Sequence, residues 1–158
     1  MPALDIGTDP DAGGTVELIS FEIGGQEYCI DVRSVREIRG WTPATPMPQT
    51  PDYILGVINL RGAVMPVLDL RCRLGLGRTE PSSRHVIVVI EEGARIAGVL
   101  VDAVQETFKL AASLLQAPPA MDSDASNQFV DAIIPLEGRM LSRLVVSALL
   151  PLEPAQVA

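Results

Sequence analysis

The chain has very few of the residues from which metal sites and reactive centres are usually built. Its 158 residues include one histidine, His85, and two cysteines, Cys29 and Cys72. Two cysteines are too few for a disulfide framework, and these two lack the spacing of a metal-binding or redox pair. A single histidine supplies no cluster of metal ligands. We therefore expect no metal, no cofactor and a reducing, cytoplasmic compartment.

Long apolar runs and export signals are also missing. The longest unbroken apolar stretch, Val86–Ile90, is far shorter than the roughly 20 residues of a membrane-spanning helix. Residues 1–14 have neither the basic start nor the apolar centre of a signal peptide, and they are too poor in apolar residues to fold. The sequence thus predicts a soluble protein with a disordered tail at residues 1–14 and no direct membrane contact.

Positive charge is scarce and dispersed. There are 12 Lys and Arg residues against 20 Asp and Glu residues, which gives a formal net charge of −8. The arginines form no basic stripe along the chain. Because nucleic acids and anionic membranes are bound by clustered positive charge, neither is an expected partner.

No set of residues has the spacing of a catalytic centre. No motif places a nucleophile and a carboxylate beside His85, so we interpret it as a surface or half-buried residue at the end of a strand. Gly75-Leu76-Gly77 lacks the third glycine and the following helix of a phosphate-binding loop. The sequence therefore predicts no catalytic residues, no small-molecule substrate and a protein that is not an enzyme.

The clearest structural signal is a β-hairpin at Gly56–Arg71. Runs rich in Val, Ile and Leu flank Arg61-Gly62, which supplies the bend. Pro66 lies inside the second run and cannot donate a ladder hydrogen bond. This strand should therefore be an edge, a bulge or a barrel corner.

Alternating apolar residues and glycine turns predict further strands along the chain. Many short strands with few helices indicate an all-β barrel or sandwich, and the halves before and after about Thr79 each hold enough strands for a small barrel. The expected elements are strands at Val16–Ile23 and Glu27–Asp31, a strand or short turn at Val35–Arg39, a helical turn at Asp52–Leu55, hairpins at His85–Val104 and Phe129–Leu141, and a helix at Ser142–Leu150.

Four motifs in a fixed order resemble those of the CheW family of chemotaxis coupling proteins. The hairpin Gly56–Arg71 is similar to the family's signature, and the likeness continues through Tyr28–Val32, Val35–Gly40 and Gly98–Val104. The resemblance implies two five-stranded β-barrel lobes packed together, to which the lack of proline and glycine in Ser142–Leu150 adds a short C-terminal helix. The expected boundaries are 15–150 for the CheW-like domain, a division between the lobes near 79–84, and a C-terminal tail at 151–158.

The same resemblance implies a non-catalytic adaptor that couples chemoreceptors to the histidine kinase CheA. The expected partners are the regulatory domain of CheA and the cytoplasmic tip of a chemoreceptor, a methyl-accepting chemotaxis protein. The chain would then be recruited to receptor arrays at the membrane. Two alternatives stay open: a scaffold of a receptor–kinase array for motility or development, and a small β-barrel enzyme acting on an apolar ligand between the lobes.

Glu37 and Arg61 are the polar residues expected at the partner-binding surface. By resemblance, both belong to a surface shared by kinase and receptor contacts, and Val35 and Gly56 lie near it. An arginine held by a carboxylate presents its guanidinium in one orientation, which limits the entropy lost on docking. An ordinary surface ion pair is the alternative for Glu37 and Arg61, and a helix stop is the alternative for Gly56.

Apolar residues occupy both alternating sets of two expected strands. In Val57-Ile58-Asn59-Leu60 and in Val86–Ile90, either one set faces a partner or both sets are buried between the lobes. Asp102 matches a family motif and equally suits a strand end that caps backbone donors in the next turn. The candidate partner-binding residues are Val35, Glu37, Gly56, Val57, Ile58, Asn59, Arg61, Val86 and Val88.

The resemblance weakens toward the C-terminus. Ala132 stands where family members commonly have a glycine, and Leu144-Val145-Val146 replaces a segment that is often acidic. The packing of the last strand and helix is therefore left open.

Overall fold

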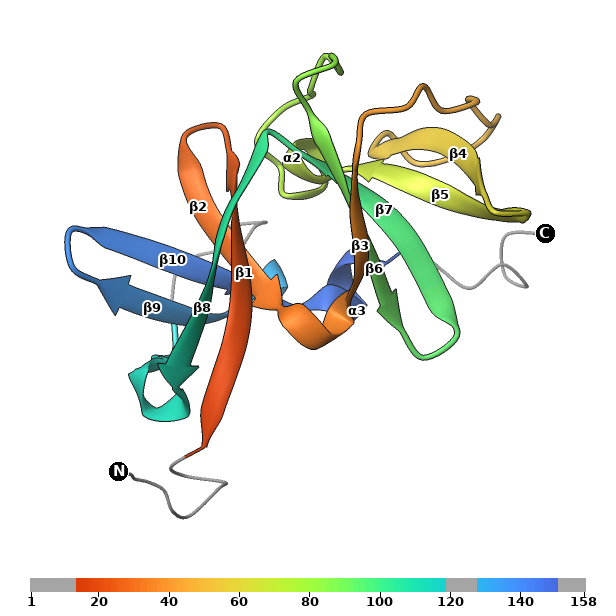
Figure 1. Cartoon of the computed structure of the whole chain (residues 1–158). Helices are drawn as coiled ribbons and strands as arrows, with labels where there is room; N and C mark the ends of the chain where they lie inside the picture. The colour runs from red at the N-terminus through yellow and green to blue at the C-terminus, as the bar shows by residue number, and fades with distance from the viewer. Residues whose placement is uncertain (1–13, 119–127, 151–158) are drawn as a thin grey trace.

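Two five-stranded sheets account for most of the described chain. The structure, a computed structural model, describes residues 14–118 and 128–150, so most of the two expected tails lies outside the described residues. The sheets form two lobes that lie side by side (Figure 1). The first lobe has the strand order β8 (Ala103–Ala111), β1 (Thr15–Ile23), β2 (Gln26–Asp31), β10 (Arg139–Leu144) and β9 (Val130–Leu136). The second lobe has the order β3 (Val35–Gly40), β6 (Val86–Glu92), β7 (Arg95–Val101), β5 (Ala63–Asp69) and β4 (Ile54–Leu60).

Short helical segments follow several strands, and aspartates at strand ends start two of them. Asp31 accepts a 2.8 Å hydrogen bond from the Arg33 N–H, and the Asp69 side chain accepts from the Cys72 N–H. Such side chains satisfy backbone donors that have no partner within the helix. The helical segments are η1 (Val32–Ser34), α2 (Leu70–Arg73), η2 (Ala112–Leu114) and α3 (Val146–Leu149).

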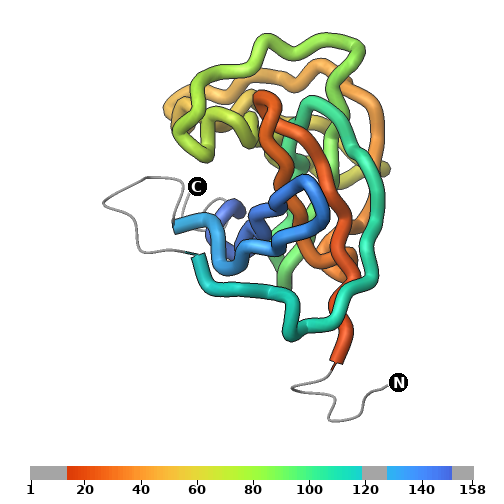
Figure 2. The backbone as a smooth tube through the Cα atoms, turned by 90° about the vertical axis from the view of Figure 1, so that its left-hand side faces the viewer, coloured from red at the N-terminus to blue at the C-terminus, as the bar shows by residue number. Residues whose placement is uncertain are grey.

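The first lobe contains strands from both ends of the described chain. β1 and β2 come first, the chain then forms the whole second lobe, and β8 returns to pair antiparallel with β1. Figure 2 shows these two segments running side by side. The division expected near residues 79–84 is therefore wrong, because this loop joins β5 to β6 within the second lobe. The β1–β8 pairing, between segments far apart in the sequence, assigns the later strands to the first lobe.

Isolated bridges join the two edges of each sheet. Thr45, which follows the edge strand β3, pairs with Val57 of the opposite edge strand β4, and Gln116, which follows β8, pairs with Ile133 of β9. Backbone hydrogen bonds of 2.7–2.9 Å run in both directions at each bridge. The all-β fold with two five-stranded lobes is thus confirmed, and each sheet curls until its edges meet, as in a barrel.

Pro66 lies where β5 changes its pairing. It is opposite Val57 of β4, whereas β5 pairs in parallel with β7 over Val67–Asp69. β5 is therefore not an edge strand. Its pairing with β7 begins only after Pro66, the residue that has no N–H to donate. The constraint that proline imposes on a sheet is met in this way.

The buried core has three parts: one inside each lobe and a third, which we call the seam, between the lobes. β6 shows how alternation divides them. Ile87 and Val89 belong to the interior of the second lobe, whereas Val88 and Ile90 belong to the seam. All four side chains are 0% exposed. Both faces of this strand are therefore buried, one of them inside a lobe and the other between the lobes.

The C-terminal helix is shorter than the sequence predicts. A helix was expected over Ser142–Leu150, but β10 continues to Leu144 and α3 covers Val146–Leu149 alone. Ser142 and Arg143 pair on both sides, with β9 and with β2, so the sheet extends into a segment whose lack of proline and glycine is compatible with helix or strand. Leu144 and Leu149 are buried in the seam.

Gly56 permits a close backbone contact and does not end a helix. The helical turn expected at Asp52–Leu55 is absent, because a turn there leads into β4 at Ile54. At Gly56 φ is +150°, and an added Cβ would lie 2.4 Å from the carbonyl oxygen of Thr45. The missing side chain allows the Thr45–Val57 bridge that closes the second lobe.

We expect Gly56→Ala to lower the free energy of unfolding by about 2–4 kcal/mol, because the methyl group would strain the backbone and collide with backbone atoms. Urea denaturation followed by circular dichroism measures this change. Gly40→Ala is the matched control in a strand of the same lobe, since nothing lies within 4 Å of a Cβ built there. Equal destabilisation by the two substitutions would contradict the role assigned to Gly56.

Candidate partner-binding surface

The tip of the β4–β5 hairpin holds Arg61 in a left-handed backbone conformation. φ is 53° at Arg61 and 88° at Gly62, and Leu60 pairs with Ala63 across the bend. Two successive positive φ values are typical of the type I′ turn, which matches the twist of a hairpin. Asn59 stabilises this turn, because its Oδ1 accepts a 2.8 Å hydrogen bond from the Gly62 N–H. The turn thus fixes the direction in which the Arg61 side chain leaves the hairpin.

Arg61 and Arg39 share the carboxylate of Glu37. Arg61 Nη2 donates to Glu37 Oε1 at 2.6 Å, and Arg39 Nη1 donates to Oε2 at 3.3 Å. Val35, Glu37 and Arg39 form the half-buried face of β3, as its alternation predicts. The hydrogen bond from Arg61, reinforced by both positive charges, lowers the pKa of Glu37. The sequence-based expectation that a carboxylate holds Arg61 agrees with this geometry.

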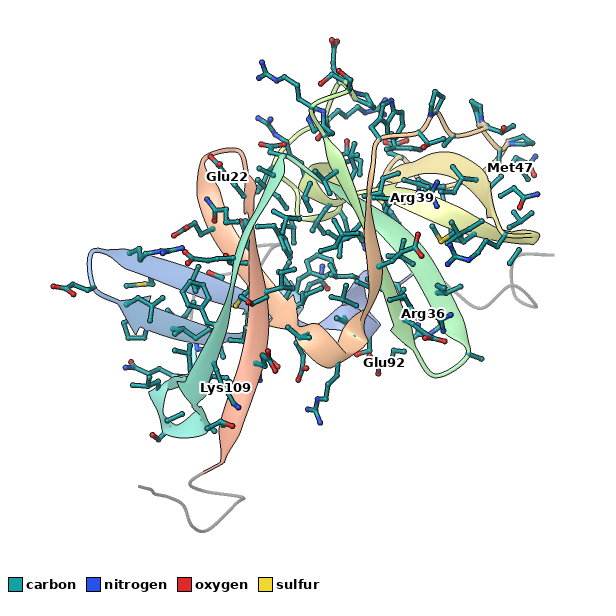
Figure 3. The ribbon with its side chains drawn as sticks, in the orientation of Figure 1. Glu22, Arg36, Arg39, Met47, Glu92 and Lys109 are labelled. Carbon is teal, nitrogen blue, oxygen red and sulfur yellow. The ribbon has the colours of Figure 1, made fainter. Side chains whose placement is uncertain are left out.

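A groove of about 320 Å³ lies beside this charged cluster. Val64, one of its lining residues, is 66% exposed, and Met47 on the segment before β4 is 46% exposed. Figure 3 shows Arg39 and Met47 on the second lobe. Exposed apolar groups bordered by charged ones are typical of protein-binding surfaces. The groove is lined by Arg39, Thr42, Pro43, Thr45, Val57, Ile58, Asn59 and Val64. We call this groove, together with Glu37 and Arg61, the second-lobe surface.

Some of the predicted partner-binding residues are accessible in the structure, and others are buried. Val88 is 0% exposed in the seam, so the prediction that it contacts a partner is wrong. Ile58 is 6% exposed and lines the groove with its remaining surface. The residues that are exposed or half-buried are Val35, Glu37, Val57, Asn59, Arg61 and Val86, and those that are buried are Gly56, Ile58 and Val88.

The structure also brings together Ser82, His85 and Asp102, which sequence reasoning did not connect. His85 Nδ1 accepts a 3.0 Å hydrogen bond from the Ser82 backbone N–H and lies 3.2 Å from Ser82 Oγ. His85 Nε2 lies 3.5 Å from Asp102 Oδ1. Because the Ser82 N–H occupies the Nδ1 lone pair, that nitrogen is not a free base for the hydroxyl. These contacts hold the turn that precedes β6. Nothing in the sequence indicates that Asp102 joins this turn, because it lies far along the chain from Ser82 and His85.

Asp102 connects the two lobes. It follows β7, and its Oδ2 accepts a 2.9 Å hydrogen bond from the Gly24 N–H in the β1–β2 turn. As expected, the Asp102 side chain accepts a hydrogen bond from a backbone donor. The donor, however, belongs to a turn of the other lobe and not to the next turn in the chain, because β7 leads directly into β8 beside β1.

The remaining candidate groups for chemistry are inert or scattered. Burial inside the first lobe raises the pKa of Cys29 to about 12, which keeps the thiol protonated and unreactive. Within residues 14–118 and 128–150, no three His, Cys, Asp or Glu side chains gather as a metal site requires. In the same part of the chain, no helix is long and apolar enough to cross a membrane.

Together these features define a class: a two-lobed, all-β protein whose candidate site is an apolar groove with an oriented arginine at its edge. The family model described as the CheW-like domain matches residues 17–153. The chain therefore belongs to the CheW-like family, and the sequence-based interpretation of it as a chemotaxis adaptor of that family is confirmed.

Individual relatives cover nearly the whole chain. The chemotaxis protein CheW of Rhizobium meliloti is 46% identical over 145 residues, which are 92% of this chain and 94% of the relative. The probable chemotaxis protein CheW of Rhizobium etli is 48% identical over 136 residues, with 86% and 88% covered. The crystal structure of the scaffolding protein TtCheW from Thermoanaerobacter tengcongensis superposes with a TM-score of 0.76 at 30% identity, covering 82% of this chain and 88% of that one.

Removal of the Arg61 side chain should raise the pKa of Glu37 toward the ordinary value of a glutamate, because the 2.6 Å hydrogen bond is lost. In the unaltered chain the lowered pKa makes the pair stabilising above the ordinary glutamate pKa. That stabilisation is lost as the pH falls through the lowered pKa of the folded state. Titration of the Glu37 carboxyl carbon by NMR in Arg61→Ala, with Arg33→Ala as control, measures the shift. An unchanged Glu37 pKa in Arg61→Ala would refute the coupling.

Proposed function

We propose that the second-lobe surface binds the regulatory domain of the histidine kinase CheA, while the junction between the lobes receives the cytoplasmic tip of a chemoreceptor. The chain then acts by position: it holds kinase and receptor together in an array at the membrane, so that receptor changes alter kinase activity. The observation that carries this proposal is the Arg61–Glu37 hydrogen bond at the edge of an apolar groove.

The exposure and fixed orientation of Arg61 suit it to binding a partner protein. Its side chain is 68% exposed although one Nη is held by Glu37, so its other donors point to solvent with little freedom left to lose. A partner that supplies an acceptor there gains a hydrogen bond at a small cost in side-chain entropy. The apolar groove beside it supplies part of the desolvated contact in an interface, whose whole area in stable complexes is about 800 Å² per partner.

The barrel-like closure of the second lobe supports an end-to-end contact. Thr45 and Val57 line the groove and also form the bridge that joins the edges of the sheet. The groove therefore rests on backbone that is hydrogen-bonded in both directions. A rigid surface of this kind binds with little rearrangement, as is usual for preorganised complexes.

Arg61→Ala should weaken binding of the purified CheA regulatory domain by about tenfold or more. The free energy of unfolding should change by less than about 1 kcal/mol, because an exposed ion pair contributes little to stability. Isothermal titration calorimetry and urea denaturation measure the two effects. Arg33→Ala is the matched control, since Arg33 is also an exposed arginine, 89% by side chain, paired with an aspartate.

A double-mutant cycle sharpens this test. Because Glu37 acts by orienting Arg61, Glu37→Ala should weaken binding of the kinase domain, and combining it with Arg61→Ala should add little further loss. Unchanged affinity in both single variants, or an equal loss in Arg33→Ala, would refute the assignment of this surface to the kinase.

A further inference from the structure

The single helical turn α2 presents two arginines to different surroundings. Arg71 lines a charged cavity of about 620 Å³ where the two lobes meet, together with Glu22 at the end of β1 and Asp102 after β7. We call it the junction cavity. Arg73 lies two residues further along, so its side chain leaves the helix in a nearly opposite direction. It contacts other residues, and these come from both lobes.

The Arg73 guanidinium lies against two aromatic rings. Its central carbon is 4.1 Å from the ring centroid of Tyr53, which precedes β4 of the second lobe. It is 4.9 Å from the ring centroid of Phe129, which precedes β9 of the first lobe. Both distances are within the roughly 6 Å at which an aromatic face attracts a cation. One side chain therefore joins segments that are far apart in the sequence and belong to different lobes.

The positive charge of Arg73 has no counter-ion among the described residues. The side chain is half-buried, and its Nε–H is buried with no hydrogen-bond acceptor in the described part of the chain. Its Nη2 donates a 3.0 Å hydrogen bond to the carbonyl oxygen of Ala148. A half-buried charge needs compensation, which here comes from two aromatic faces and one carbonyl group. An apolar side chain at this position would lose all three interactions.

The C-terminal helix α3 depends on contacts from outside itself. It is one turn long, and a helix of this length is not stable in water alone. Its last carbonyl groups have no donor within the helix. Arg73 donates to the carbonyl of Ala148, and Arg95 at the start of β7 donates to that of Ser147 at 3.5 Å. Arginines of the second lobe thus hold the end of α3, in addition to its buried apolar side chains.

We infer that Arg73 is the positioning residue that sets the angle between the lobes, because it fastens both ends of the β9–β10 segment to the second lobe. Phe129 lies directly before β9, and α3 follows β10. The Val145 N–H donates a 2.8 Å hydrogen bond to the Phe129 carbonyl, so these two ends lie together beside one guanidinium. The junction cavity has walls from both lobes, and its width therefore depends on this angle.

Hydrogen exchange measures the fastening directly. The N–H groups of Leu149 and Leu150 donate to carbonyls at the start of α3, so they exchange faster when the helix is released. Arg73→Met should accelerate their exchange by about tenfold or more and leave the Val57 N–H of the second-lobe bridge unchanged. Arg73→Lys keeps a positive charge beside the rings and should restore most of the protection. Equal exchange in the Met and Lys variants would show that only the aliphatic stem matters and would overturn the inference.

Arg71→Met is the matched control for this measurement. It removes an arginine from the same helical turn, and the Arg71 Nε donates to the Leu76 carbonyl and not to α3. Equal acceleration in Arg71→Met, or equal acceleration of the Val57 N–H in Arg73→Met, would overturn the inference. If Arg73→Met does not fold, Tyr53→Leu removes one of the rings and should accelerate the same α3 groups. Unchanged exchange in Tyr53→Leu would then overturn it.

A binding measurement connects this inference with the proposed function, on which this measurement alone rests. The second-lobe surface lies within one lobe, so Arg73→Met should change the affinity for the CheA regulatory domain by less than about twofold. Affinity for a receptor cytoplasmic fragment, proposed to bind where the lobes meet, should fall by about tenfold. Equal losses for both partners would overturn the assignment of Arg73 to the lobe angle. Failure of the unaltered chain to bind either partner would instead refute the proposed function and leave the exchange test standing.

Discussion

The apolar seam between the lobes is the contact on which both candidate surfaces depend. Side chains from β1, β2, β5, β6 and β7 meet there, and α3 closes it from the C-terminal side. Fully burying one such side chain contributes about 1.5–3 kcal/mol. Because the seam sets how the lobes face each other, it also determines the shape of the charged cavity at their junction.

The two surfaces use charge in opposite ways. On the second-lobe surface, Glu37 binds two arginines, so the polar groups are oriented before a partner arrives and the groove supplies apolar contact. In the cavity, Arg71 and Glu22 have no ionic partners among the described residues, and apolar contact is limited. Apolar burial governs affinity, whereas complementary charge governs register and the rate of encounter.

Local features of this fold were predictable from the sequence, and long-range ones were not. The hairpin bend at Arg61-Gly62 is confirmed, because turn residues act over a few positions, and the Glu37–Arg61 pair followed from the family resemblance. The lobe division failed, because nothing near residues 79–84 reveals that β8 pairs with β1. The prediction that Val88 contacts a partner is wrong for a related reason. The residue pattern of β6 shows that both of its faces are apolar, but it does not show what covers each face. The helix stop that stands as the alternative for Gly56 is wrong, because the glycine allows a close contact with Thr45, and the neighbouring residues do not reveal a contact with another segment.

The order of strands also has a consequence for how the polypeptide acquires its structure during synthesis. The second lobe is one continuous segment, from β3 to β7, inserted between the strands of the first. All of its strands are available as soon as β7 leaves the ribosome, whereas the first lobe must wait for β8, β9 and β10. Until then β1 and β2 remain an isolated hairpin, which is marginally stable in water. The inserted lobe thus provides the apolar template against which the earlier and later parts of the chain are finally assembled.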